Sequence, residues 1–250
     1  MNTVVVIPAR FASTRLPGKP LRLIAGLPMV VRTARQAVQG GFPVWVAHDD
    51  ARIAAALAGE PVQVVATRSD HANGTERLCE VADKESWADD TIVVNVQGDE
   101  PLLPPALIRE VAATLAAHPE AAVATLATPF STADDPTAAT AVKVVRDQQG
   151  LALYFSRAAI PYVRDADGVS GAFPYLRHIG IYAYRVAALK RYPQLAATPL
   201  EQAEKLEQLR FLEHGLRIAV GVVNEAPPPG VDCEEDLQRV EAFLRGAGAV

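Results

Sequence analysis

Residues 3–20 read TVVVIPARFASTRLPGKP, a continuous β-branched run that leads into a loop with three basic side chains. A second continuous run, TIVVNV, occupies residues 91–96. Strands covered on both faces have this unbroken apolar pattern, whereas half-exposed strands alternate between apolar and polar residues. The two runs therefore predict central parallel strands of a buried sheet.

The segments between these two strands alternate between helical and extended patterns. Helices are predicted over residues 29–39 and 51–57, and short strands over residues 44–47 and 62–66. The order of strand, helix, strand and helix is typical of a doubly wound α/β sheet. We therefore expect a Rossmann-like fold in the first half of the chain.

The second half departs from this alternation. Two short strands separated by the turn sequence DQQG predict a β-hairpin over residues 141–155. Thr198, Pro199 and Glu201 mark a helix start with a capping box. Further elements are predicted over residues 106–116 (helix), 179–184 and 217–223 (strands) and 233–244 (helix). Because no composition shift marks a linker, we predict one domain over residues 1–250, with the hairpin as an appendage of the main sheet.

Composition excludes several classes of protein. The chain has 250 residues, of which 50% are hydrophobic, and 24 basic against 29 acidic side chains give a net charge of −5. A folded chain of this length buries roughly 70 to 75% of the surface that it exposes when unfolded. With this hydrophobic content and a slightly negative net charge, we expect neither a disordered chain nor a basic protein that coats nucleic acid. The two cysteines, Cys79 and Cys233, have no metal-site spacing. Without a signal-peptide pattern or an apolar run of about 20 residues, we expect a soluble cytoplasmic protein that does not insert into membranes.

The loop after the first strand is the first candidate site. Ligands of open α/β sheets bind beyond the carboxyl ends of the strands, and this loop places Arg10, Arg15 and Lys19 there. Three cations favour an anion such as a phosphate, although a solvated basic loop is the alternative. The loop has neither the G-x-G-x-x-G pattern of dinucleotide-binding enzymes nor the Ser or Thr that follows Gly-Lys in a P-loop.

Two carboxylates are candidate metal ligands. Asp99 follows the strand at residues 91–96, and Asp232 precedes the last predicted helix. Mg²⁺ prefers one or two carboxylates together with substrate phosphates. From the residues alone, Asp99 equally fits a turn, and Asp232 equally fits a helix N-cap.

The second half carries further candidates, each with a structural alternative. His178, Gly180 and Tyr182 share one face of a strand, which permits a common pocket wall, but a lone His in an apolar strand is usually packed. Arg157 suits a carboxylate ligand, or equally a structural ion pair. Glu207 and Gln208 lie off the leucine stripe of their helix, which by itself indicates solvated surface. Cys79 is predicted to be a small buried residue, Cys233 is rejected as a nucleophile, and His48 and His71 stay unassigned.

These motifs, taken together, resemble the 3-deoxy-manno-octulosonate cytidylyltransferase family, whose members activate an acidic sugar with CTP. The resemblance begins with residues 8–20 and runs to the last helix. It departs at Asn73, where the family usually has Ser, and at Cys233-Glu234, where Thr-Pro is usual. The other matching motifs are TRSDH (67–71), GTER (74–77), VNVQGDEP (94–101), AVKVV (141–145), YFSR (154–157), RHIGIY (177–182), LEQLR (206–210) and GVD (230–232).

The resemblance implies a fold, a reaction and a set of site residues. It implies a mostly parallel mixed sheet of the nucleotide-diphospho-sugar transferase type. The implied reaction is CTP plus 3-deoxy-D-manno-octulosonate (Kdo) giving CMP-Kdo and pyrophosphate, for lipopolysaccharide biosynthesis. It implies that Mg²⁺ binds between Asp99 and Asp232. The implied catalytic residues are these two aspartates together with Arg10, Arg15 and Lys19. The implied nucleotide-binding residues are Pro8, Ala9, Arg10, Arg15, Lys19, Arg68, Asn73, Gly74, Arg77 and Gln97, and the implied sugar-binding residues are Gln97, Arg157, His178, Tyr182, Glu207 and Gln208.

Partners and alternatives complete the expectations. The resemblance implies a homodimer, and the hairpin at residues 141–155 is the candidate interface because edge strands need a partner or a cover. Residues 67–77 are expected to select cytosine over uracil.

Two alternative functions are considered. The first is transfer of CMP to another acidic sugar, such as sialic acid or an amino analogue of Kdo, and the second is a nucleotide-binding regulator without turnover. Asp99, Asp232 and Arg157 together argue against the regulator, because binding alone needs no pair of metal carboxylates.

Overall fold

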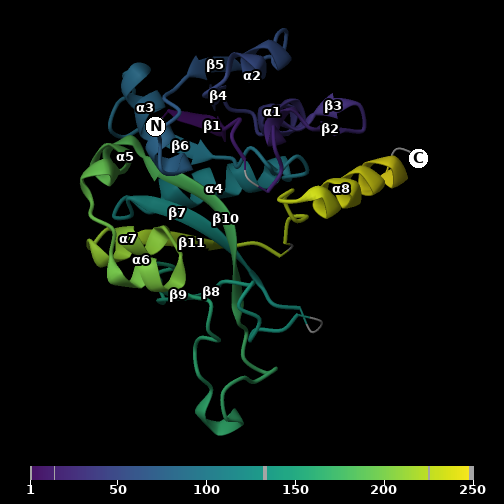
Figure 1. Cartoon of the computed structure of the whole chain (residues 1–250). Coiled ribbons are helices and arrows are strands. Elements are labelled where there is room, and N and C mark those ends of the chain that lie inside the picture. The colour runs from purple at the N-terminus through teal and green to yellow at the C-terminus, as the bar shows by residue number, and fades with distance from the viewer. Residues whose placement is uncertain (1, 14, 132–133, 225, 248–250) are drawn as a thin grey trace.

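The computed structural model describes residues 2–13, 15–131, 134–224 and 226–247. Their core is a mixed nine-stranded sheet in the order β11-β7-β10-β6-β1-β4-β5, with β8 paired to β10 and β9 to β8 (Figure 1). The predicted parallel half is confirmed, since β1 pairs in parallel with β4 and β6, and β4 with β5. These strands are β1 (Thr3–Ala9), β4 (Val44–His48), β5 (Gln63–Ala66) and β6 (Ile92–Asn95).

The other half of the sheet gives the fold its mixed character. The long strand β10 (Leu176–Arg185) runs antiparallel between β6 and β7 (Val123–Pro129). The strand β11 (Ile218–Val222) then pairs in parallel with β7. The doubly wound, mostly parallel mixed sheet is therefore confirmed, with β10 as the reversed strand.

Helices cover both faces of the sheet and explain the unbroken apolar strands. One face packs against α1 (Met29–Val38), α2 (Ala51–Ala56) and α4 (Pro105–Ala117). The other face packs against α3 (Gly74–Lys84), α5 (Val186–Arg191) and α7 (Gln208–Glu213). Alternate residues of β1 enter the two cores, with Val5 and Ile7 on one side and Val4 and Val6 on the other.

A third apolar cluster packs the loop after β1 against other parts of the chain. It joins Leu16 of this loop to the ribbon of β2 (Leu23–Ile24) and β3 (Leu27–Pro28) and to α8 (Glu234–Ala247). The turn η1 (Lys19–Leu21) connects the loop to the ribbon. Figure 1 shows α8 beside β2 and β3, remote in sequence but adjacent in space. This packing brings the residues before α8 to the end of β1.

Two elements differ from the sequence prediction. The strand β7 was not predicted, although all but its last residue are buried. The helix predicted from Thr198 is interrupted, because α6 (Pro199–Glu204) ends at Lys205, which has a left-handed backbone with φ of 54°. A second short helix, α7, then starts at Gln208 and turns the chain back toward the sheet.

The predicted hairpin is confirmed as β8 (Lys143–Arg146) and β9 (Ala152–Ser156). Its turn is fixed to the main sheet, because Val220 donates a backbone hydrogen bond of 2.8 Å to the carbonyl of Gly150. Beyond β9 an arm that contains η2 (Arg164–Ala166) projects away from the sheet before the chain returns in β10 (Figure 1). After α5, the turn η3 (Tyr192–Gln194) leads to α6. Within the described ranges, no helix has both the length and the apolar character that a membrane crossing requires.

Candidate active site

The loop after β1 lines a cavity of about 480 Å³ at the carboxyl end of the central strands. Arg10, Arg15 and Lys19 all line it, so the structure brings the three predicted cations together. The turn after β6, which includes Gln97 and Asp99, also lines the cavity. Two loops that follow adjacent parallel strands thus enclose one cationic site, as the topology of an open α/β sheet requires.

The turn after β6 lies directly on the end of β1. A Cβ atom at Gly98 would lie 2.6 Å from the carbonyl oxygen of Pro8, a distance that no side chain permits. Only glycine therefore allows the turn to pack this closely. This close approach fixes Asp99 relative to the basic loop.

Lys19 bridges the two predicted metal carboxylates. Its Nζ donates hydrogen bonds to Asp99 Oδ2 at 2.6 Å and to Asp232 Oδ1 at 3.0 Å. Arg15 adds two hydrogen bonds of 3.1 Å, one to each oxygen of Asp232. The structure therefore gathers two carboxylates and two cations at one edge of the cavity.

The local structure around Asp99 and Asp232 shows whether their side chains serve a turn or a helix cap, or instead contact Lys19. The last helix begins at Glu234, and Asp236 in its first turn accepts hydrogen bonds from the backbone of Asp232 and Cys233 at 2.9 and 3.1 Å. The carboxylate of Asp232 is thus not used as a cap and faces Lys19 instead. Asp99 does lie in a turn, as the alternative expected, and its side chain still reaches Lys19.

A second cavity of about 200 Å³ adjoins the first and shares Pro8, Arg10 and Gln97 with it. Arg77 lines it and is only 2% exposed. Its guanidinium pairs with Asp49 at 3.2 Å and donates to the hydroxyl of Thr67. Burial lowers the pKa of Arg77, and the charge of Asp49 opposes that shift.

Asp49 is a site residue that the sequence analysis missed. It follows β4, and its other oxygen accepts a hydrogen bond of 2.8 Å from the backbone of Phe11 in the basic loop. One buried carboxylate thus joins the basic loop to Arg77 on α3. Its position directly after a buried parallel strand was the signal that could have found it.

Asn73 and Gly74 start α3 beside the second cavity. Asn73 Oδ1 accepts from the backbone of Glu76 at 2.9 Å, and its Nδ2 donates to the hydroxyl of Tyr192 at 2.9 Å. The side chain of Asn73 therefore acts as a helix cap, and Asn fulfils this role as well as Ser does. Gly74 lies against the ring of Pro8, where an added Cβ would make ordinary contact at 3.5 Å.

A third cavity of about 220 Å³ continues from the second and shares Gly74 and Gln97 with it. The predicted sugar-binding residues Tyr182, Glu207 and Gln208 line it. The remaining lining residues, none of them predicted, are Thr75, Asn95, Tyr184, Lys205, Leu206 and Phe211.

Polar groups of this third cavity lack protein partners. Among the described residues, Asn95 Oδ1 and Gln208 Nε2 are buried without a hydrogen bond. Burial raises the pKa of Glu207, and the nearby carboxylate of Glu201 adds to the shift. Buried polar atoms without partners are costly, so this wall is suited to a ligand rich in hydroxyl groups.

The rings of His178 and Tyr182 lie close together on β10, but Tyr182 lines the third cavity and His178 does not. Their ring centroids are 5.4 Å apart, and His178 Nε2 lies 2.9 Å from the hydroxyl of Thr125. Burial lowers the pKa of His178 to about 3, so its ring is neutral at pH 7. The pairing of β10 with β7 is irregular between Ile179 and Tyr182, and Gly180 within this stretch is exposed, with open space beside it.

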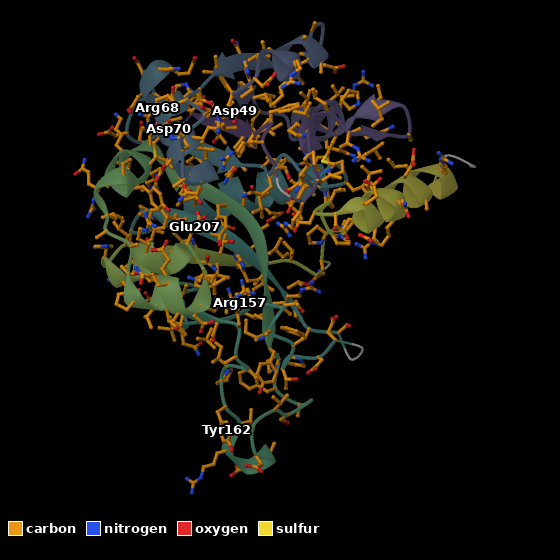
Figure 2. The ribbon with its side chains drawn as sticks, viewed as in Figure 1. Asp49, Arg68, Asp70, Arg157, Tyr162 and Glu207 are labelled. Carbon is orange, nitrogen blue, oxygen red and sulfur yellow. The ribbon has the colours of Figure 1, made fainter. Side chains whose placement is uncertain are left out.

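Arg157 lies beside the third cavity rather than in its wall. Its Nε donates to the carbonyl of Glu204 at 2.8 Å, and its Nη1 donates to the carbonyl of Ala139 at 3.0 Å. Glu204 in turn accepts from the hydroxyl of Ser156 at 2.6 Å. Figure 2 shows Arg157 between Glu207 and the arm that carries Tyr162. Its guanidinium thus holds the corner between α6 and α7 that supplies Lys205 and Glu207.

Arg68 is a predicted nucleotide-binding residue that lies outside the walls of the three cavities. It lines none of the cavities described above, and its guanidinium lies 3.5 Å from Asp70, with both side chains exposed (Figure 2). Its backbone N–H donates to Glu80 at 3.0 Å.

The cysteines behave as predicted. Cys79 is buried, its thiol donates to the carbonyls of Thr75 and Leu189, and burial raises its pKa to about 12. The pKa of the Cys233 thiol is also raised, by its hydrogen bond to Glu235. Neither thiol is an activated nucleophile.

Comparison with known proteins agrees with this geometry. A family model described as cytidylyltransferase matches residues 4–218. This chain belongs to the cytidylyltransferase family. Two relatives are named 3-deoxy-manno-octulosonate cytidylyltransferase. The protein from Dichelobacter nodosus is 64% identical to this chain, and the match covers 96% of each sequence. The protein from Alkalilimnicola ehrlichii is 52% identical, and the match covers 98% of this chain and 96% of the relative.

One solved structure is also similar to this chain in fold. A solved structure described as CMP:2-keto-3-deoxy-manno-octonic acid synthetase complexed with CTP has a TM-score of 0.90 and 42% sequence identity. The match covers 99% of this chain and all of that one. The family resemblance and the fold expected from the sequence are therefore confirmed.

Proposed function

We propose that this cytidylyltransferase transfers CMP from CTP to the anomeric hydroxyl of Kdo, giving CMP-Kdo and pyrophosphate. The observation that carries the proposal is the contact of Lys19 with both Asp99 and Asp232 at a cationic cavity. The names of the relatives and of the solved structure support the choice of substrates. Pyrophosphate release that requires both CTP and Kdo tests it.

The chemistry needs positioning and charge neutralisation rather than a protein nucleophile. Arg10, Arg15 and Lys19 line the cavity that would take the triphosphate. The anomeric oxygen of Kdo then forms a bond to the α-phosphorus, the bond from this phosphorus to the bridging β-oxygen breaks, and pyrophosphate leaves. The hydroxyl proton passes to solvent. Fixed cations around the reacting phosphate stabilise its developing charge without reorganisation.

Asp99 and Asp232 fit a divalent cation such as Mg²⁺. In the structure a cationic group, Lys19 Nζ, already lies within hydrogen-bond distance of both carboxylates. No cluster of three or more His, Cys, Asp or Glu side chains suited to a metal occurs among the described residues. Two carboxylates without further protein ligands suit Mg²⁺, which binds with substrate phosphates. When bound, the ion supplies charge neutralisation and orients the phosphates.

The third cavity is the proposed site for the sugar acid. Tyr182, Glu207 and Gln208 line it, and Gln97 connects it to the triphosphate site. Lys205 brings a positive charge to this cavity, which suits a carboxylate substrate. We place the reaction in the cytoplasm, and its product would be the activated Kdo for lipopolysaccharide.

Arg157→Ala is expected to raise the KM for Kdo about tenfold while the KM for CTP changes little. The substitution removes two hydrogen bonds to backbone carbonyls, each worth on the order of 1 kcal/mol or more, and loosens the corner that presents Lys205 and Glu207. Initial rates with each substrate varied in turn measure the effect. Arg109→Ala is the matched control, because it removes a hydrogen bond of 3.1 Å from an exposed arginine to the backbone carbonyl of Gln39, outside the site and the arm. An unchanged KM for Kdo would remove Arg157 from sugar binding.

We further propose that the chain forms a homodimer through the hairpin and the arm beyond it. Strand β9 pairs with β8 alone among the described strands. Leu153 of β9 is 63% exposed and Tyr162 of the arm is 64% exposed. An unpaired edge next to exposed large apolar side chains is the pattern of an interaction surface.

Sedimentation velocity tests the dimer. The wild-type chain is expected to sediment as a dimer, and Leu153→Asp is expected to shift it to monomer. Leu23→Asp, at an equally exposed leucine on the β2–β3 ribbon, is expected to leave the dimer intact. A wild-type monomer at micromolar concentration would contradict the proposal.

A further inference from the structure

The start of α3 and the start of α7 both form walls of the third cavity. Gly74, at the start of α3, lines the second and the third cavity alike. The beginning of α7 and the residue before it supply the lining residues Glu207, Gln208 and Phe211. A reaction between ligands of these two cavities therefore needs α3 and α7 at a fixed distance from each other.

The helix α7 is too short to fix its own position. It has six residues and follows the left-handed break at Lys205. A helix of this length gains little stability from its own hydrogen bonds, because its first turn is costly to form. Side chains that tie α7 to its neighbours therefore determine where its cavity-lining residues lie.

Tyr192 joins the start of α3 to α7. It begins the turn η3 and is fully buried. Asn73 Nδ2, at the cap of α3, donates a hydrogen bond of 2.9 Å to its hydroxyl. Its ring stacks on Phe211 with centroids 5.2 Å apart, and the guanidinium of Arg210 lies 4.7 Å from the ring centroid. One side chain thus contacts the helix cap at the second cavity and two successive residues of α7.

Arg210 is itself held in a fixed geometry. Its Nε and Nη2 donate hydrogen bonds of 2.7 and 2.6 Å to the two carboxylate oxygens of Glu201 in α6, and both side chains are largely buried. Such a bidentate pair fixes orientation as well as distance. The helices α6 and α7 and the ring of Tyr192 therefore form one packed unit, and the hydroxyl of Tyr192 links this unit to α3.

We propose that Tyr192 is a positioning residue for the acceptor sugar, because through Asn73 it holds the α7 wall of the third cavity at a fixed distance from the nucleotide. The inference rests on the proposed function, which places the sugar acid in the third cavity. Reacting atoms must approach to about 3–3.5 Å, and a small displacement of one substrate lowers the rate steeply. Loss of the contact should therefore impair the use of the sugar and not the binding of CTP.

A double-mutant cycle between Asn73 and Tyr192 tests the contact. Asn73→Ser keeps a helix cap but removes the amide that reaches Tyr192, and Tyr192→Phe removes the hydroxyl. Each single variant is expected to lower kcat/KM for Kdo about tenfold at saturating CTP. Because both remove the same contact, the double variant should lie within about twofold of either, whereas independent effects would multiply to about 100-fold. In calorimetry without sugar, Tyr192→Phe should bind CTP as the wild type does.

Cys79→Ala is the matched control for a lost contact of α3. The Cys79 thiol ties α3 to α5 through a hydrogen bond of 3.1 Å to the carbonyl of Leu189, and Cys79 lines none of the three cavities. This variant should keep the wild-type kcat/KM, and circular dichroism should show every variant folded at the assay temperature. A wild-type kcat/KM for Kdo in Tyr192→Phe, or effects that multiply in the double variant, would overturn the inference.

Hydrogen exchange gives a second test that does not depend on turnover. CTP bound without sugar is expected to slow amide exchange over residues 206–213 of the wild type, because Tyr192 transmits the ordering of α3 to α7. The same segment of Tyr192→Phe should not respond. Equal protection in both proteins, or none in the wild type, would contradict the inference. If the wild type released no pyrophosphate from CTP and Kdo, the proposed function would fail instead, so the two failures are distinguishable.

Discussion

Asp99→Asn and Asp232→Asn are each expected to lower kcat at least 10²–10³-fold while the fold stays intact. Both carboxylates touch Lys19 at the triphosphate cavity, and both are the proposed ligands of the divalent cation. Loss of one preorganised charge-stabilising group commonly costs about 2.7–4 kcal/mol in the transition state, and loss of a metal ligand should cost at least as much. Steady-state kinetics over a Mg²⁺ titration measures the effect.

The control for these two variants is Asp89→Asn. Asp89 also pairs with a lysine, Lys190, at 2.7 Å, but its side chain is exposed and it precedes β6, at the opposite end of that strand from the turn that carries Asp99. It should keep wild-type rates, and circular dichroism should show all three variants folded. Near-normal turnover of both site variants at limiting Mg²⁺ would restore a purely structural role for Asp99 and Asp232.

Arg77→Met is expected to lower the free energy of unfolding by about 3–5 kcal/mol. The substitution leaves the buried carboxylate of Asp49 without its cation, and an unpaired buried charge has a cost of this size. Urea unfolding followed by circular dichroism measures it. The loss should also disturb CTP binding, because Asp49 holds the backbone of Phe11 in the basic loop.

Two further variants show whether the loss comes from the buried charge. Arg77→Met combined with Asp49→Asn removes the charge yet keeps an acceptor for Phe11, so it should lose less stability than Arg77→Met alone. Lys190→Met breaks the exposed pair of Lys190 with Asp89 and should cost no more than about 1 kcal/mol. A loss of 1 kcal/mol or less for Arg77→Met would show that the pair is not needed for stability.

The sequence predicts the parallel half of the sheet because its signal is local. Residues 4–7 and 92–94 are apolar at every position, and the runs that contain them became two central strands, β1 and β6. The basic loop could also be predicted, since any residue directly after β1 must lie at the carboxyl edge of the sheet. The strand β7 escaped prediction because its two alanines and its terminal proline are weak strand formers, and pairing with β10 and β11 determines its structure.

Within the candidate site, long-range packing limited what the sequence could predict. Asp232 could be placed at the cavity only by resemblance, because its approach to Lys19 depends on the packing of Leu16 against Val231 and Leu237. Lys205 could not be predicted, because its place in the cavity depends on a left-handed break between α6 and α7. For Arg157 the sequence left a ligand and a structural role open, and its described contacts are with backbone carbonyls.

The most direct test of the account is product analysis with one enzyme and a matrix of substrates. CTP, UTP and ATP are each combined with Kdo, an amino analogue of Kdo and sialic acid, in the presence of Mg²⁺. Pyrophosphate release and the mass of the nucleotide sugar are both recorded. The account predicts that CTP with Kdo gives CMP-Kdo and pyrophosphate in equal amounts, at a rate well above every other pair. A faster reaction with another nucleotide or sugar acid, or CTP binding without any nucleotide sugar, would contradict it.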